Sequence, residues 1–368
     1  MTATTNRPKI KRTHFFESSR FALQKITDLC NFVLPTAAAL WSLRWQVSGF
    51  YEVCSSNSSE RDNQLNNRFV SGSDLPTGGD LIAACIGTSW DEQKQKLAEI
   101  LLIDFCSIYE FWCDGIVSEV VTSLKAEKGN HYSAITLGNQ RQDEAWVKQR
   151  LQFPEDPGNT KPKRRAGIKS ALAALSGENE ESDILSNLIY PKLVGNKKYS
   201  LGQLNELIYC YRYFKELRNN RAHHGQVTPD FLISQSKYSS LSETELFGSG
   251  DHGRRQQEKP EYIHFTPGSG GTVPDISLRG LIGFGEVISR IITSVDIELS
   301  KSKNAEHVLI HRLKSMGVNE KIKTRDKSKI KGIVGKLFYD EALLPKPKPV
   351  SQELIDLLHN NGIIDYEL

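Results

Sequence analysis

Several common signatures are missing from this sequence. No run of about 18 uninterrupted apolar residues is present, and Lys25, Asp28 and Arg44 interrupt the apolar stretch at 21–45. The first eleven residues are polar and basic and lack the apolar core of a signal peptide. The six cysteines form no CxxC pair. We therefore expect a cytoplasmic protein without a membrane partner, whose thiols are free and mostly buried.

Motifs for cofactor and metal chemistry are missing as well. The sequence has no Walker A motif, no G-x-G-x-x-G after a strand and no G-x-S-x-G. His307 and His311 have the i,i+4 spacing of zinc ligands, but neither the glutamate of an H-E-x-x-H motif nor a third ligand accompanies them. Gly283-Phe284-Gly285 lies in a helical pattern and indicates close helix packing. The sequence therefore predicts no cofactor and no metal.

A strong excess of charge of one sign is also absent. The 368 residues carry a formal net charge of +3, whereas a dedicated nucleic-acid domain is usually more basic. The positive charge is local instead. Its densest run provides candidate contacts to an RNA backbone, although such runs are often only a solvated surface. This basic run consists of Lys161, Lys163, Arg164 and Arg165.

Apolar residues recur with helical spacing along most of the chain, which predicts an all-α helix bundle. We expect one or two helices at 15–55, a long one at 90–125 opened by a Ser89–Glu92 capping box, a helix after Ser200 and one at 276–300. Polar segments at 54–80, 126–165 and 226–275 are predicted as loops, with a short strand at 262–265. Short helices are expected at 305–316 and 330–338 and after Ser351.

Three parts of the chain follow from this pattern. Residues 1–88 are predicted to form an N-terminal helical extension, and residues 89–300 the main helix bundle. Residues 301–368 have a composition rich in Lys, Glu and Asn, and they are predicted to form a small basic C-terminal helical module.

The most informative segment is Glu216-Leu-Arg-Asn-Asn-Arg-Ala-His-His-Gly225. Arginine offers a permanent charge and forked donors that suit a phosphate, and histidine exchanges a proton near neutral pH. Arg218 and His223 lie about 140° apart around an unbroken helix, whereas Asn219 and His223 are i,i+4 neighbours. Asn219 is therefore a candidate for orienting His223. Arg221 and His224 are second-tier candidates.

The order Arg218-Asn219-x-x-x-His223, with a long apolar helix before it and another helix after it, resembles the HEPN superfamily. The resemblance implies a metal-independent endoribonuclease that leaves 2′,3′-cyclic phosphate and 5′-hydroxyl ends, and it implies a homodimer that brings two motifs together. It further implies a toxin or an anti-phage effector, with an antitoxin or defence partner. HEPN proteins often carry a glutamate on the helix before the motif. Glu110 is therefore a candidate supporting residue as well as a structural acid.

Other interpretations stay open at this point. The polar cluster is also typical of a plain helix end, where histidines and a C′ glycine are favoured. Alternatively, a HEPN-like dimer binds RNA or a nucleotide without cleaving it, or serves as the interaction subunit of a defence complex. RNA cleavage without divalent metal, lost on His223→Ala, separates the nuclease from these alternatives.

Overall fold

The structure is a computed structural model, and it describes residues 13–54, 56–71, 83–128, 135–137, 140–155, 166–177, 181–222, 227–248, 259–260, 275–318, 320–322, 326–342, 344–347 and 349–366. Most of these residues are helical, which confirms the all-α class. Two short strand pairs occur among them. β1 (Ile135–Leu137) pairs antiparallel with β2 (Gln140–Gln142), and β3 (Glu320–Ile322) pairs parallel with β4 (Ile364–Tyr366).

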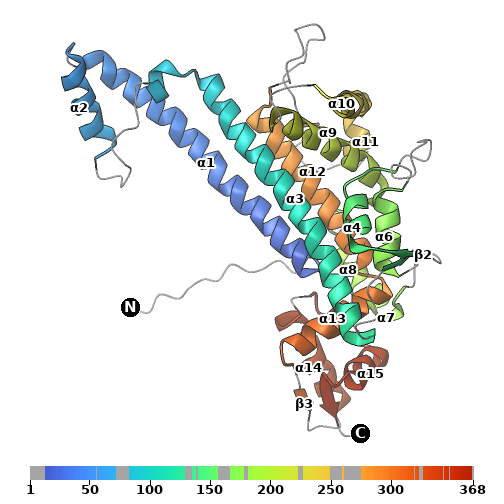
Figure 1. The fold of residues 1–368 in the computed structure, drawn as a ribbon. Helices are drawn as coiled ribbons and strands as arrows, with labels where there is room; N and C mark the ends of the chain where they lie inside the picture. Colours follow the sequence, from blue (N-terminus) through green and yellow to red (C-terminus); the bar gives the residue numbers. More distant parts are fainter. Residues whose placement is uncertain are drawn as a thin grey trace, which may run out of the picture.

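Two long helices, α1 (Glu17–Val53) and α3 (Trp90–Lys128), lie side by side and antiparallel (Figure 1). Contacts between Phe21 and Phe111 near one end, and between Trp41 and Trp90 near the other, fix their register. α2 (Ser58–Phe69) and the π-helical turn η1 (Ala83–Gly87) connect them. The Ser89–Glu92 capping box is confirmed, since each residue's backbone N–H donates to the other's side chain at 2.7 and 3.2 Å.

α1 is one continuous helix although Pro35 lies inside it. Proline removes the N–H that would bond to the carbonyl of Asn31, but both residues are exposed, so water can satisfy that carbonyl. Among the described residues, α1 is also the one helix whose length and composition would allow it to cross a membrane. Lys25, Asp28 and Arg44 interrupt its apolar sequence, which is why no such helix is predicted from an uninterrupted apolar run.

The core lies where α9 (Leu204–Ala222) and α12 (Leu278–Leu299) pack against α3 (Figure 1). Aromatic rings fill this junction, with Tyr109 and Tyr211 4.2 Å apart between ring centroids and Phe214 stacked on Phe284 at 4.4 Å. The helices approach closely at Gly285, where an added Cβ would lie 2.8 Å from the ring of Phe105. The expected packing role of the Gly283-Phe284-Gly285 segment is therefore confirmed at Gly285.

Each of the three segments predicted as loops contains a helix, so these predictions are wrong in part. The helices are α2 in 54–80, α4 (Glu144–Arg150) in 126–165, and α10 (Pro229–Ser240) with α11 (Glu243–Phe247) in 226–275. All four are short and bury only two or three side chains, or one in the case of α2, so they leave little apolar periodicity. Each nevertheless begins after a side chain that caps it. These N-cap residues are Asn57, Asp143, Thr228 and Ser242.

The region before α9 holds α6 (Ile168–Ser176), α7 (Asp183–Leu188), α8 (Tyr190–Leu193) and the 3-10 turn η2 (Leu201–Gln203). Ser200 precedes η2, but its side chain makes no cap bond to that turn. Its hydroxyl instead accepts a hydrogen bond of 2.7 Å from the buried Arg290 of α12. This tertiary contact replaces the local one.

The chain ends in α13 (Lys303–Ser315), α14 (Lys327–Asp340) and α15 (Gln352–Asn360). α13 follows α12 closely and packs on α3 and α6. The expected boundary at residue 300 therefore lies between α12 and α13, which both pack on α3. The helix predicted after Ser351 is α15, and the side chain of Ser351 caps it. The strand expected at 262–265 lies outside the described residues.

Candidate active site at the end of helix α9

The structure describes only part of the predicted site. Arg218, Asn219 and Arg221 lie in the last turns of α9, which ends at Ala222. Glu110 lies on α3, whereas the remaining predicted side chains lie outside the described residues. They are His223, His224, Lys161, Lys163, Arg164 and Arg165.

Arg218 is held by the supporting residue that the sequence suggested. A terminal nitrogen of its guanidinium donates to Oε1 of Glu110 on α3 at 2.7 Å. The Nζ atom of Lys215, one turn earlier on α9, lies 2.8 Å from the same oxygen. About a third of the Glu110 side chain and a quarter of the Arg218 side chain are exposed. Glu110 is therefore placed beside the motif and links α3 to α9.

Arg221 is paired as well, which the sequence analysis did not anticipate. Its guanidinium contacts Glu99, which lies three turns before Glu110 on α3. It also lies 3.1 Å from the carboxylate of Asp275, which precedes α12. Arg221 thus connects α9 to two other elements. We refer to Glu99, Glu110, Lys215, Arg218, Arg221 and Asp275 as the motif cluster.

The two asparagines of the motif have different environments. Asn220 is buried and anchors the start of α10, because its Oδ1 accepts from the backbone N–H of Thr228 at 2.8 Å and its Nδ2 donates to the carbonyl of Glu216 at 2.7 Å. Asn219 is half-buried and makes no side-chain hydrogen bond within the described part of the chain. Asn219 therefore remains available for the role predicted for it, whereas Asn220 is structural.

Sequence reasoning missed a regular spacing of cations on α9. Basic residues recur at every third position, at Arg212, Lys215, Arg218 and Arg221. The first of them pairs with Glu216 on the same helix and lies over the ring of Phe153. A three-residue step advances by about 4.5 Å and turns back by about 60°, so the row winds slowly around the helix. The spacing was visible in the sequence, but the acidic partners were not.

Fully buried side chains lie next to the motif cluster. Cys106 and Tyr211 are fully buried beneath it, and burial raises the pKa of the Cys106 thiol to about 12. Burial likewise raises the pKa of Tyr211 well above its usual range. Low polarity on one side strengthens the attraction between the charges above it.

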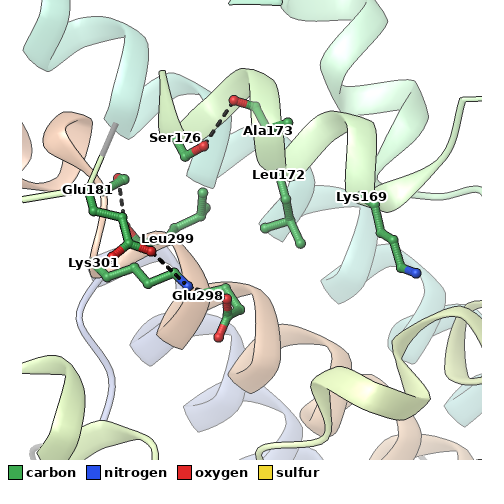
Figure 2. Close-up of a pocket in the computed structure, with 9 residues that line it drawn as sticks. Lys169, Leu172, Ala173, Ser176, Glu181, Glu298, Leu299 and Lys301 are labelled. Carbon is green, nitrogen blue, oxygen red and sulfur yellow. Dashed lines mark hydrogen bonds and ion pairs between the residues drawn. The ribbon is translucent and has the colours of Figure 1, made fainter. Parts of the chain in front are cut away.

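A separate cavity of about 170 Å³ lies at the other end of α12 (Figure 2). Glu298 is one of several polar residues that line it. Its carboxylate accepts from the hydroxyls of Tyr190 at 3.0 Å and Tyr199 at 2.5 Å and pairs with Lys301 at 3.2 Å. Asp275 and Glu298 bracket α12, so about 30 Å of helix separate this cavity from the motif cluster. The cavity contains none of the predicted site residues.

Comparison of the chain with protein-family models, with curated proteins and with solved structures found no significant match.

Proposed function

We propose that this protein is a metal-independent endoribonuclease of HEPN type. The observation that carries the proposal is the Arg218-Asn219-x-x-x-His223 motif at the end of a helix that packs into an all-α core. Support comes from Arg218 itself, which is held in place by Glu110 and still partly exposed. An arginine fixed by a carboxylate is already oriented before a phosphate arrives, which lowers the entropic cost of binding.

The reaction needs a proton acceptor, a proton donor and a cation. The 2′-hydroxyl of RNA loses its proton to an imidazole and attacks the adjacent phosphorus, so that the P–O2′ bond forms. The P–O5′ bond then breaks, and the leaving oxygen takes up a proton. In the proposed mechanism His223 moves the protons and Arg218 stabilises the charge on the phosphoryl oxygens. Asn219 orients His223 or a phosphate oxygen.

We further propose that the enzyme is a homodimer in which two motifs meet. The exposed side of α3 supports this, because Ile100, Ile103 and Phe111 are 54%, 51% and 62% exposed there. The three side chains lie within about 80° of one another around the helix. Contiguous exposed apolar surface is rare on soluble monomers and typically marks an interaction surface. α3 also carries Glu99 and Glu110, so a partner on this strip would approach the motif cluster.

The test is incubation of the purified protein with total RNA in EDTA, followed by mapping of the cleaved ends. We expect cleavage with 2′,3′-cyclic phosphate ends, reduced about 100-fold or more by His223→Ala or Arg218→Ala. His311→Ala and Arg68→Ala serve as controls, since both residues lie outside the motif cluster. Full cleavage by the two motif variants, or a strict requirement for magnesium, would refute the proposal.

The ion pairs of Arg218 and Arg221 also favour a second candidate function. A guanidinium held by the carboxylate of Glu110, or by those of Glu99 and Asp275, has less free charge to stabilise a transition state. This suits a protein that holds RNA or a nucleotide without cleaving it. Such a dimer would be an interaction subunit of a defence complex. In the same experiment it would retain RNA on the protein and leave it intact.

The biological setting follows from the HEPN resemblance alone. An unrestrained ribonuclease would harm its own cell, so we propose a cytoplasmic toxin or anti-phage effector. An antitoxin or another defence protein would restrain it. Co-purification of a partner that abolishes cleavage tests this part.

A further inference from the structure

The charges of the motif cluster and its neighbour do not balance evenly. Arg212 and Glu216 form a neutral pair. Arg221 faces two carboxylates, those of Glu99 and Asp275, and this group is net negative. Lys215 and Arg218, in contrast, share the single carboxylate of Glu110, so this group is net positive. Of these three groups, an anion is therefore attracted most strongly to the last one.

The geometry of that group matches a phosphodiester. Both cations converge on one oxygen of Glu110, at 2.8 and 2.7 Å. A carboxylate presents two oxygens on one central atom, as the non-bridging oxygens of a phosphodiester do, and both carry one negative charge. A cationic site that accepts the first can accept the second after a small rearrangement of the side chains.

Arg218 also has an unused donor. Its Nε atom is buried and has no hydrogen-bond partner among the described residues. A buried donor without a partner costs free energy, and an arriving acceptor would remove that cost. The terminal nitrogens and Nε of arginine form a fork that binds two phosphate oxygens at once. Within the described residues, Glu110 accepts from one terminal nitrogen of this guanidinium.

We propose that Lys215 and Arg218 form a phosphodiester-binding site and that Glu110 is its internal counter-ion, which an RNA phosphate displaces. This inference rests on the proposed function, because it assigns the substrate-binding cations of the same site. Glu110 then has two effects. It orients the cations in the free protein, and it weakens the binding of RNA because the phosphate must compete with it.

The experiment measures binding rather than cleavage. A fluorescent single-stranded RNA whose sugars are all 2′-O-methylated cannot undergo attack by the 2′-oxygen, so it serves as the probe for the full-length chain. We expect Glu110→Gln to tighten binding about threefold to tenfold, because it removes the competing charge and keeps the size of the side chain. Lys215→Ala should weaken binding by a similar factor. It should also reduce the slope of log affinity against log salt by about 0.7, the contribution of one phosphate on a single strand.

Two matched controls lie on α3, the helix that carries Glu110. Asp114→Asn removes an acid one turn after Glu110 that pairs with Lys148 at 3.3 Å, and Lys125→Ala removes a lysine that pairs with Glu144 at 3.3 Å. We expect neither control to change the affinity or the salt slope. Thermal unfolding of every variant shows whether it is folded, and Glu110→Gln keeps the proposal testable if Lys215→Ala fails to fold.

Two outcomes would overturn the inference. One is binding by Glu110→Gln that is unchanged or weaker, which would make Glu110 only a positioning residue for Arg218. The other is an unchanged affinity and salt slope in a folded Lys215→Ala. Cleavage of unmodified RNA is scored separately. A chain that shows the predicted binding changes but never cleaves RNA would refute the nuclease and leave the phosphate site standing.

Discussion

Two clusters of charged residues, each with a carboxylate on α3, invite comparison. The motif cluster surrounds Glu110. Two to three turns further along, Glu119 belongs to an N-terminal clamp, which we define as Asp296, Glu119 and Arg312 around residues 15–18. Asp296 accepts from the backbone N–H groups of Phe15 and Phe16 at 2.7 and 2.9 Å. Glu119 accepts from those of Glu17 and Ser18, both at 3.1 Å.

The partners of the carboxylates differ in kind. In the clamp they are mostly backbone groups, and Arg312 also donates to the carbonyls of Phe15 at 3.0 Å and Ala342 at 3.3 Å. Asp296 is completely buried. In the motif cluster all partners are side chains on a partly exposed surface, which can rotate and exchange. The clamp therefore fixes the fold, whereas the motif cluster has the freedom that ligand binding needs.

The largest effect expected from this comparison is at Arg312. Arg312→Ala removes the cation of the clamp and leaves Glu119 and two carbonyls without it. Breaking a buried pair in this way costs about 3–5 kcal/mol, so we expect a loss of this size in the free energy of unfolding by urea. The equivalent change at the motif, Arg218→Ala, is the control and should cost far less. Equal losses at the two sites would contradict the distinction between them.

The pH dependence of Asp296 is the next prediction. Burial raises the pKa of Asp296 from 3.8 to about 7, although the N–H groups of Phe15 and Phe16 oppose the shift. Because the folded pKa is above the unfolded one, the stabilisation is complete below about pH 4 and is lost as the pH rises through 7. At about 1.4 kcal/mol per pKa unit, the change in the free energy of unfolding is about 4 kcal/mol. Asp296→Asn should remove it from chemical denaturation curves between pH 4 and 8.

His14 in the same region provides the opposite control. It lies 3.1 Å from the hydroxyl of Thr293, and burial lowers its pKa from 6.5 to about 4. Its stabilisation is present above pH 6.5 and is lost as the pH falls toward 4. His14→Gln should therefore leave a stability that declines more steeply with rising pH than in the wild type. If both variants keep the wild-type profile, the clamp does not titrate as described.

These two clusters show which parts of the structure the sequence could predict. The Ser89–Glu92 capping box and the helix after Ser200 depend on residues close together in the chain, and both were predicted correctly. The pairing of Glu110 with Arg218 joins positions 108 residues apart. The sequence singled out Glu110 as a candidate supporting residue, but nothing in the helix pattern identifies Arg218 as its partner. Lys215 could have been predicted as a site residue, because the three-residue spacing of the cations is visible within one segment of the sequence.

A change in the packing between α12 and α3, at Gly285 and Phe105, should lower the free energy of unfolding less than the loss of Arg312 does. Gly285→Ala adds a methyl group that would lie 2.8 Å from the ring of Phe105, so the packing of α12 on α3 must shift. We expect the free energy of unfolding, measured by thermal unfolding, to fall by about 1–3 kcal/mol. Gly49→Ala in α1 is the control, because no atom lies within 4 Å of the added Cβ. In a helix this change should stabilise the protein by up to about 1 kcal/mol. A Gly285→Ala protein as stable as the wild type would mean that the layer is looser than described.

The smallest expected effect is the coupling between Glu110 and Arg218. Both side chains are partly exposed, and pairs of this kind contribute about 0.2–1 kcal/mol in double-mutant cycles. A cycle of Glu110→Gln, Arg218→Ala and the double variant, measured by urea unfolding, should give a coupling in this range that shrinks as salt is added. The corresponding cycle of Glu119→Gln and Arg312→Ala should give a larger coupling with little salt dependence, because those groups are largely buried. If the motif pair instead couples as strongly as the clamp pair, Glu110 holds Arg218 too tightly for a phosphate to displace it. Arg218 would then be a structural residue, and the second candidate function would lose its phosphate contact as well.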